Sequence, residues 1–313
     1  MRRLVPLLLC LLLLSSCAAR SPLSPVTAPE DVTIPAPQSP ATTQETATLW
    51  FRFDQEPLLA PEERSLDLSP TKAYELTLLE ALLAGPSASA SELQGLFPQG
   101  TRVLATTRQG RTLFVTLSRQ IMNRYPDETE GVDTAESRLR RLLAMQSIAA
   151  TVTENCDVDT VIVLVEQSDA VTDSLRLKES YYLTGSDAPA APLKRDESLL
   201  LTPTTTLSTI LQCWQDRDFA RLYRYVARTD AATGQQRPQE AEFIAQMEGL
   251  PHLTQWAVSG GSVSGDRATL SALMHCADGG TASETAGVFR LMRERGLWKI
   301  EYSQLSSRKE AAP

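Results

Sequence analysis

The sequence is poor in the residues that build metal centres and proton-transfer sites. Its 313 residues include five cysteines and two histidines, and aromatic residues make up 6%. The cysteines that follow Cys17 are too widely spaced for a metal site, whose ligands recur at short intervals. No nucleophile and base form a recognisable catalytic pair. We therefore expect a protein that is not an enzyme and that binds no metal ion and no cofactor.

The chain also lacks an excess of positive charge. Its formal net charge is −8, and removal of a leader that carries Arg2 and Arg3 would make it more negative. Nucleic-acid binding depends on basic patches, and electrostatic adhesion to anionic lipid depends on clustered lysine and arginine. The composition argues against both kinds of partner.

One short motif is typical of an enzyme. Ser69-Pro70-Thr71-Lys72 fits S-x-x-K, the nucleophile motif of penicillin-binding proteins. The K-T-G motif of the same enzymes is absent from the sequence. Serine is a favoured helix cap and proline a favoured first helical residue. We therefore interpret Ser69-Pro70 as the start of a helix.

No apolar run at the N-terminus is long enough to cross a bilayer. The run from Leu4 to Leu14 follows two arginines, and a spanning helix needs about 20 apolar residues. Its length is typical of the apolar core of a signal peptide. Leu14-Ser15-Ser16-Cys17 then resembles the bacterial lipobox, in which small residues precede the cysteine that becomes the mature N-terminus.

Cys17 is the predicted lipidation site. Residues 1–16 would be the signal peptide, and acyl chains on Cys17 would anchor the protein stably to the membrane. The alternative is an ordinary secretory signal with an incidental cysteine. Residues 17–45 are rich in proline, serine, threonine and alanine, a composition typical of a disordered tether. We expect a protein that is lipid-anchored at the extracytoplasmic face of the cell membrane.

The predicted fold class is α+β in two domains, the first spanning residues 46–185. Alternating and aromatic-rich stretches indicate strands, and apolar residues at helical spacing indicate helices. Helices covering one face of a mixed sheet make an α+β sandwich. The predicted elements are a strand at 47–54, a helix at 71–85, a hairpin at 101–118, a helix at 133–153, a strand at 158–166 that is buried on both faces, and a strand at 181–184.

Several motifs in this region carry a resemblance to a known family. In chain order they are "WFRFD", "LAPEER", "LLEALLAGP", "LFPQGT", "VTLS" and "TVTENCDVDTVIVLVE". Together they resemble the GerMN domain of sporulation and spore germination proteins, over roughly residues 46–168. The usual "VDG" ending stands here as Val165-Glu166-Gln167. The resemblance implies a non-catalytic interaction module of envelope lipoproteins and spore-forming bacteria, and it assigns no catalytic residue.

The most specific part of the resemblance has a simple structural interpretation. Gly85-Pro86 and 97–100, "FPQG", are turn sequences, because proline fixes φ and glycine supplies positive φ. A functional loop at 85–100 is the alternative.

A linker at 186–203 is predicted to lead into a second domain at 204–305, with a tail at 306–313. Two helices, the first interrupted near Asp216-Arg217-Asp218, are followed by four strands with glycine-containing reversals. The predicted strands are 253–263, 267–277, 285–296 and 297–305. "CWQDRDFARLYRYV" and "RERGLWKIEYSQL" resemble the NTF2-like, or cystatin-like, domains appended to many bacterial lipoproteins. That fold places helices on a curved antiparallel sheet.

The NTF2-like resemblance implies a pocket between the helices and the sheet. Candidate pocket residues are Asp218, Tyr223 and His275. Each also has a structural interpretation: Asp218 in the interhelix turn, Tyr223 in the core, and His275 facing away from the neighbouring Cys276 on one strand. A disulfide between Cys213 and Cys276 across the helix–sheet interface is a further hypothesis.

Three functions remain open. The favoured one is a non-catalytic interaction module that docks other envelope proteins, with sporulation or spore germination as a specific case. The alternatives are a small-ligand-binding or enzymatic pocket in the second domain, and direct binding to peptidoglycan. The expected partners are the membrane, through the lipid on Cys17, and other envelope proteins, with a homo-oligomer as an open alternative and no nucleic acid.

Overall fold

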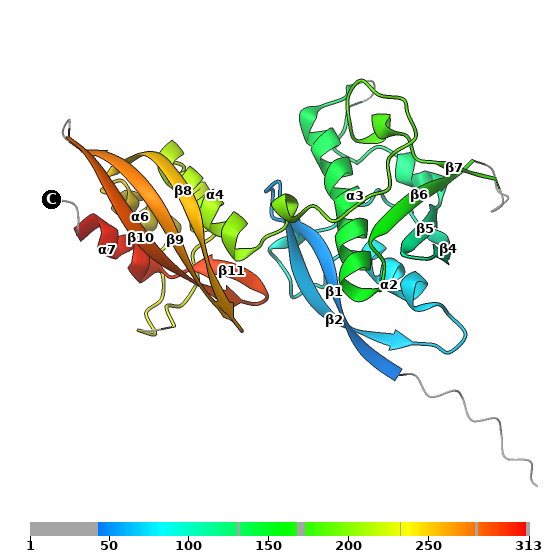
Figure 1. Ribbon diagram of the computed structural model, residues 1–313, viewed down its shortest axis with the longest axis horizontal. Coiled ribbons are helices and arrows are strands. Elements are labelled where there is room, and N and C mark those ends of the chain that lie inside the picture. The colour runs from blue at the N-terminus through cyan, green and yellow to red at the C-terminus, as the bar shows by residue number, and fades with distance from the viewer. Residues whose placement is uncertain (1–42, 130–131, 168–172, 232, 279–280, 311–313) are drawn as a thin grey trace, which may run out of the picture. The chain divides into compact units, whose positions relative to one another are not determined.

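The computed structural model describes residues 43–129, 132–167, 173–231, 233–278 and 281–310. The described chain is α+β, as the sequence predicts, and it holds three sheets and their helices (Figure 1). Among the described residues, no helix combines the length and apolarity needed to span a bilayer. Cys17 and the predicted signal peptide lie outside the described residues.

The aromatic strand near the N-terminus belongs to a small antiparallel sheet. Its strands are β1 (Thr43–Phe53), β2 (Leu59–Leu68) and β3 (Leu93–Gln94), in the order β2-β1-β3. Beside the short β3, the edge of β1 is bonded by side chains of a helix: Trp50 N donates to Thr151 Oγ1 (3.1 Å), and Asn155 bonds both the N–H and the C=O of Thr48. These side chains satisfy backbone groups that a longer strand would otherwise have to pair.

A second sheet contains the predicted hairpin. Its order is β4-β5-β6-β7, and β5 and β6 are parallel. The strands are β4 (Val103–Gln109), β5 (Thr112–Leu117), β6 (Thr160–Glu166) and β7 (Ser174–Arg176). The hairpin turns at Gly110, whose φ is +58°, a conformation that favours glycine. The strands of the first segment (residues 43–185) thus form two sheets, where the sequence predicts one.

Two strand predictions in this segment are wrong in detail. β6 is not buried on both faces: Val161, Val163 and Val165 are buried, whereas Ile162 and Leu164 are half-buried. The strand predicted at 181–184 is replaced by a short 3-10 helix at Glu179–Tyr181. Tyr181 is anchored by its hydroxyl, which donates to Ile121 O at 3.1 Å.

Helices α2 (Tyr74–Leu83) and α3 (Ala135–Asn155) each contact a strand of both sheets. α3 begins where predicted, with Thr134 as its cap. α2 begins later than predicted, and Ser69-Pro70 is not its cap. Lys72 N donates to Ser69 O at 3.1 Å, so residues 69–72 form a turn before the helix.

The second segment (residues 203–310) has helices on one antiparallel sheet of order β11-β10-β9-β8, as predicted (Figure 1). The interhelix break is at Arg217, whose φ of +59° ends α4. The elements are α4 (Pro203–Asp216), α5 (Phe219–Tyr223), α6 (Glu240–Met247), β8 (His252–Ser264), β9 (Arg267–Asp278), β10 (Thr281–Glu294), β11 (Leu297–Ile300) and α7 (Tyr302–Glu310).

The end of the chain corrects one prediction. The last strand stops at Ile300, and α7 occupies the positions predicted as strand end and tail. Leu305 is buried and gives this polar helix its apolar contact.

Residues 186–203, predicted as a linker, make sheet-like contacts with the first segment. Leu193 pairs with Val161, and Leu200 pairs with Leu59. Leu200 and Leu201 are buried. A further 3-10 helix lies at Glu197–Leu199, and another lies earlier at Arg119–Met122.

Candidate functional site

The structure does not form the hypothesised disulfide. Cys213 and Cys276 both carry thiols. Arg221 and Glu56 are electrostatic neighbours of Cys213, whereas Cys276 is an electrostatic neighbour of Arg308 on α7. The two cysteines thus have different surroundings in the second segment. Burial raises the pKa of the Cys213 thiol to about 12, which keeps it protonated and unreactive.

The three candidate pocket residues are not brought together. Asp218 caps α5 by accepting from Arg221 N at 3.0 Å. The Tyr223 hydroxyl donates to Pro238 O at 3.0 Å, and its ring lies under the Arg237 guanidinium. His275 faces outward, with Nε2 at 3.6 Å from Glu284 Oε2. Each side chain takes the structural role that the sequence offers as its alternative.

Side chains fill the space between the helices and the sheet of the second segment. Among them are Trp214, Phe243 and Phe289, each no more than 1% exposed. None of the three candidate pocket residues lines either of the two cavities described below.

The two segments meet at a buried ion-pair cluster, here called the junction. Glu56, 3% exposed, follows β1 and accepts three hydrogen bonds from the Arg221 guanidinium of α5, at 2.6–3.0 Å. Arg224 Nη1 lies 3.1 Å from Asp54 and 3.6 Å from Glu56. The hydrogen bonds that Arg221 donates to Glu56 raise the pKa of Arg221, so this arginine stays charged. A bidentate arginine–carboxylate pair fixes the direction of approach as well as the distance.

A second buried cation closes the same junction. Lys299 of β11 is 1% exposed, and its Nζ donates to Glu92 at 2.7 Å and lies 4.8 Å from the Phe53 ring centroid. Burial lowers the pKa of Lys299, while Glu92 opposes that shift. Lys299 therefore joins the second segment to the loop before β3.

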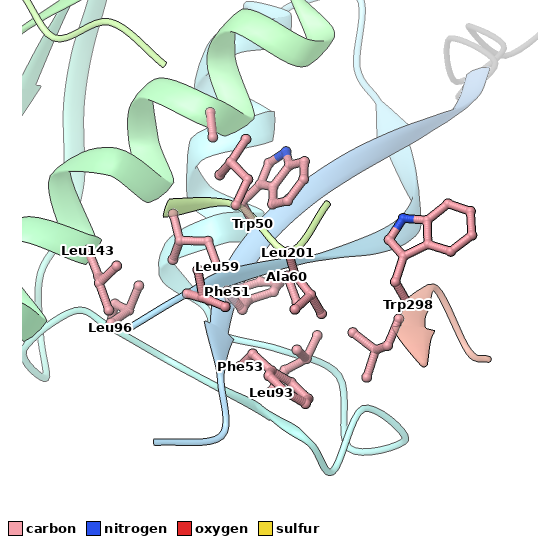
Figure 2. Close-up of a cluster of buried hydrophobic side chains, with 14 of the residues drawn as sticks. Trp50, Phe51, Phe53, Leu59, Ala60, Leu93, Leu96, Leu143, Leu201 and Trp298 are labelled. Carbon is pink, nitrogen blue, oxygen red and sulfur yellow. The ribbon is translucent and has the colours of Figure 1, made fainter. Parts of the chain in front are cut away.

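Apolar packing surrounds these charges. The rings of Phe53 and Tyr225 meet edge to face at 5.3 Å. Figure 2 shows side chains of both segments in one buried cluster, including Trp50, Phe53 and Leu93 from the first and Trp298 from β11. A junction of this kind, buried and bonded in fixed directions, holds the walls of any site between the segments in place.

A groove of about 1150 Å³ opens beside the junction and is the candidate site. Both segments line it. The first contributes strand residues of β1 and β2 together with 87–93, and the second contributes the β8–β9 and β10–β11 turns. Val263 in the groove is 58% exposed, which makes it an apolar contact available to a partner.

Most charges in the groove are already paired or stacked. The Arg195 guanidinium lies 5.2 Å from the Trp50 ring centroid, and Arg293 lies 4.8 Å from that of Trp298. Two exposed charges differ: Glu63 on β2 and Arg295 in the β10–β11 turn form no ion pair with any described residue. The groove therefore offers one negative and one positive contact, one from each segment.

The groove wall explains two of the family-like motifs. Arg64, the last residue of "LAPEER", donates to Ala81 O (3.1 Å) and Gly85 O (3.0 Å) at the end of α2. Arg64 also donates to the Glu62 carboxylate, which in turn accepts from Ser87 N at 3.1 Å. "LAPEER" is thus joined to "LLAGP", and together they shape one wall. The motifs can be seen in the sequence, but the hydrogen bonds between them cannot.

The "FPQGT" turn lines a smaller cavity of about 340 Å³ with Arg52, Tyr125 and Arg140. Its cations are neutralised: Arg52 bonds Glu136 at 2.5 Å, and Arg140 bonds Asp127 at 2.7 Å. The hydrogen bond from Arg52 lowers the pKa of Glu136. These are the hydrogen bonds of a structural support, and no unpaired charge faces the cavity among its described lining residues.

Comparison with known proteins identifies the first segment. Residues 48–170 match the model of the Germane family, described as "Sporulation and spore germination". This range coincides with the span over which the sequence motifs resemble the GerMN domain. The match lies within the first segment and covers less than half of the chain. No curated protein matches the chain.

Three solved structures match parts of this chain. The tandem GerMN domains of the sporulation protein GerM from Bacillus subtilis are 12% identical, with a TM-score of 0.34, and the match covers 82% of this chain and 71% of that one. A candidate lipoprotein from Clostridium perfringens is 15% identical, with a TM-score of 0.27, over 51% of this chain and 91% of that one. An NTF-2-like protein of unknown function from Shewanella oneidensis is 13% identical, with a TM-score of 0.25, over 32% of this chain and 94% of that one.

Proposed function

We propose that this protein is a non-catalytic, lipid-anchored envelope protein whose groove binds an extended segment of another envelope protein. Cys17 anchors it at the extracytoplasmic face, and residues 17–45 give the folded part its reach. The GerMN domain supports a place in sporulation or spore germination. The lipobox-like sequence supports the anchor.

The composite groove is the observation that carries this proposal. Its volume of about 1150 Å³ exceeds the roughly 300–1,000 Å³ of ordinary small-molecule pockets. Its walls mix an exposed valine, serines and the opposite charges of Glu63 and Arg295. Such a surface suits a peptide segment, which presents main-chain polar groups, apolar side chains and charges together.

The test is co-purification with charge-reversal variants. Membranes of the native organism are cross-linked, and the proteins bound to Glu63→Lys or Arg295→Glu chains are compared with those bound to the wild type. We expect one or more wild-type partners to be reduced at least severalfold in both variants. Lys194→Glu and Glu240→Lys are matched controls, because both residues are exposed and lie outside the groove. Equal recovery from all variants would contradict the proposal.

The anchor and the cellular role need a second experiment. A fluorescent protein that folds outside the cytoplasm is fused to the C-terminus. We expect membrane signal that Cys17→Ala abolishes, and a focus at a division or engulfment septum that develops on starvation. Uniform membrane signal throughout vegetative growth would remove the sporulation role and leave a general envelope lipoprotein.

A further inference from the structure

The edge of β10 on the β11 side, here called its outer edge, is covered in part by helix α7. β11 pairs only with residues 291–294 of β10, so no strand within the described ranges neighbours the preceding part of β10 on that side. The side-chain amide of Gln304 instead bonds both backbone groups of Arg290: Arg290 N donates to Oε1 (2.8 Å), and Nε2 donates to Arg290 O (2.6 Å). Arg308 Nη2 donates to Val288 O at 2.9 Å. Helix α7 thus occupies the position of a missing strand.

The alternation of the strand identifies which groups face this edge. Arg290 and Val288 present backbone groups to α7, and a strand repeats every two residues. Ala286 and Glu284 therefore present their N–H and C=O to the same edge, beyond the hydrogen bond from Arg308 to Val288 O. Val288 is 55% exposed, so the edge also offers an apolar side chain. Uncovered edges of this kind pair readily with another strand.

The packing of α7 on the β10 edge includes a destabilising feature. The Arg308 guanidinium is packed 4.0 Å from the Phe289 ring centroid, and its Nε is buried without a hydrogen-bond partner. A Cβ on Gly287 would lie 2.8 Å from Met274 Cε and 2.9 Å from Arg308 Nη1, so the absence of a side chain at this position makes room for both side chains. A buried donor without a partner is destabilising, which makes release of α7 easier than release of an ordinary core helix.

We propose that the Glu284–Arg290 edge of β10 is a dimerisation edge that α7 covers, and that its partner is the same edge of a second copy. Antiparallel pairing about a two-fold axis at Gly287 places Glu284 opposite Arg290 twice, and Ala286 opposite Val288 twice. All four residues are exposed on the outer face. Opposite charges in directly facing positions stabilise a strand pair, and like charges destabilise it. Pairing about Glu284 itself would place its carboxylate opposite its own copy.

The experiment measures self-association of the full chain by sedimentation equilibrium in density-matched detergent. Gln304→Ala/Arg308→Ala removes the hydrogen bonds that hold α7 to the edge, and Gly287→Ala crowds Arg308 and Met274 without changing the sequence of α7. We expect the wild type to be monomeric and both variants to dimerise. Ser303→Ala/Ser306→Ala is the control on the same helix and should stay monomeric.

Charge swaps then test the register. In the uncovered background, Arg290→Glu places glutamate opposite glutamate and should weaken the dimer about tenfold. Adding Glu284→Arg should restore it. If both uncovering variants remain monomeric, or if a dimer forms that is insensitive to these swaps, the proposal is wrong. Because the two variants uncover the edge by different changes, misfolding of one leaves the other to decide.

Discussion

At the scale of single residues, Glu56 joins the two segments. It is 3% exposed and accepts from Arg221, a residue 165 positions later in the chain. Removing one partner of a buried pair leaves the other charge without its compensation, and this is more costly than the net worth of the pair. Loss of Glu92 would likewise leave the buried charge of Lys299 without its compensation.

Glu56→Gln is therefore expected to lower the free energy of unfolding by about 2 kcal/mol. Breaking a fully buried pair would cost more, but Arg221 retains some access to water. Glu63→Gln, an exposed residue with no ion pair among the described residues, is the matched control and should change stability by less than about 0.5 kcal/mol. Urea denaturation monitored by tryptophan fluorescence measures both. Equal effects of the two variants would show that the pair does not hold the junction.

The Arg52–Glu136 pair predicts a pH dependence. The hydrogen bond from Arg52 lowers the pKa of Glu136 below its ordinary value of 4.5. A carboxyl whose folded pKa is depressed stabilises the fold above its unfolded pKa and loses that contribution as pH falls through the folded pKa. The stability difference between wild type and Glu136→Gln should be largest near neutral pH and shrink below about pH 4.5. Denaturation midpoints at several pH values measure it, and a difference independent of pH would contradict the assignment.

At the scale of elements, side chains replace backbone pairing at two strand edges. Asn155 of α3 bonds both backbone groups of Thr48, and Gln304 of α7 does the same for Arg290. Both helices thereby satisfy backbone groups that a neighbouring strand would otherwise pair.

Helix α3 depends on its cap. Thr134 Oγ1 accepts from Ser137 N at 3.0 Å, and loss of such a cap typically costs about 1 kcal/mol. We expect Thr134→Ala to destabilise the protein by that amount, measured by urea denaturation. Thr129→Ala in the exposed preceding loop is the control. No difference between the two would mean that α3 begins without help from this side chain.

Local patterns predicted local structure well. The aromatic-rich stretch of β1, the glycine turn of the β4–β5 hairpin and the apolar face of α3 are all signals carried within a few residues. The predicted start of α2 and the predicted end of β11 are wrong. The turn at Ser69 and the packing of α7 set these boundaries, and neither is visible in local sequence patterns. The α7 sequence has no strong apolar periodicity, and its contacts with β10 decide its place.

The candidate site was beyond sequence inspection for the same reason. Glu56 pairs with a residue 165 positions away, and Glu92 with one 207 positions away. Neither glutamate stands in a motif. The family-like motifs did lead to the groove wall, since "LAPEER" and "LLAGP" shape it through Arg64. The residues chosen as a pocket, Asp218, Tyr223 and His275, were selected by chemical type, and none of them lines either cavity described above.

At the scale of the whole molecule, the junction predicts cooperative unfolding of both segments. Buried charges and aromatic contacts couple them, so neither should unfold without exposing the other. We expect one calorimetric transition in the wild type and two in Glu56→Gln/Lys299→Met. Two transitions already in the wild type would mean that the segments unfold independently.

The most direct test of the proposed function is site-specific photo-cross-linking in the native organism. A photoreactive amino acid replaces Glu63 in the groove, and in a separate strain it replaces Lys194 as a control. Binding in the groove predicts discrete adducts to an envelope protein from position 63, which Arg295→Glu reduces and which position 194 does not form. The absence of adducts at position 63, or the same adducts at both positions, would contradict the claim that the groove binds a partner.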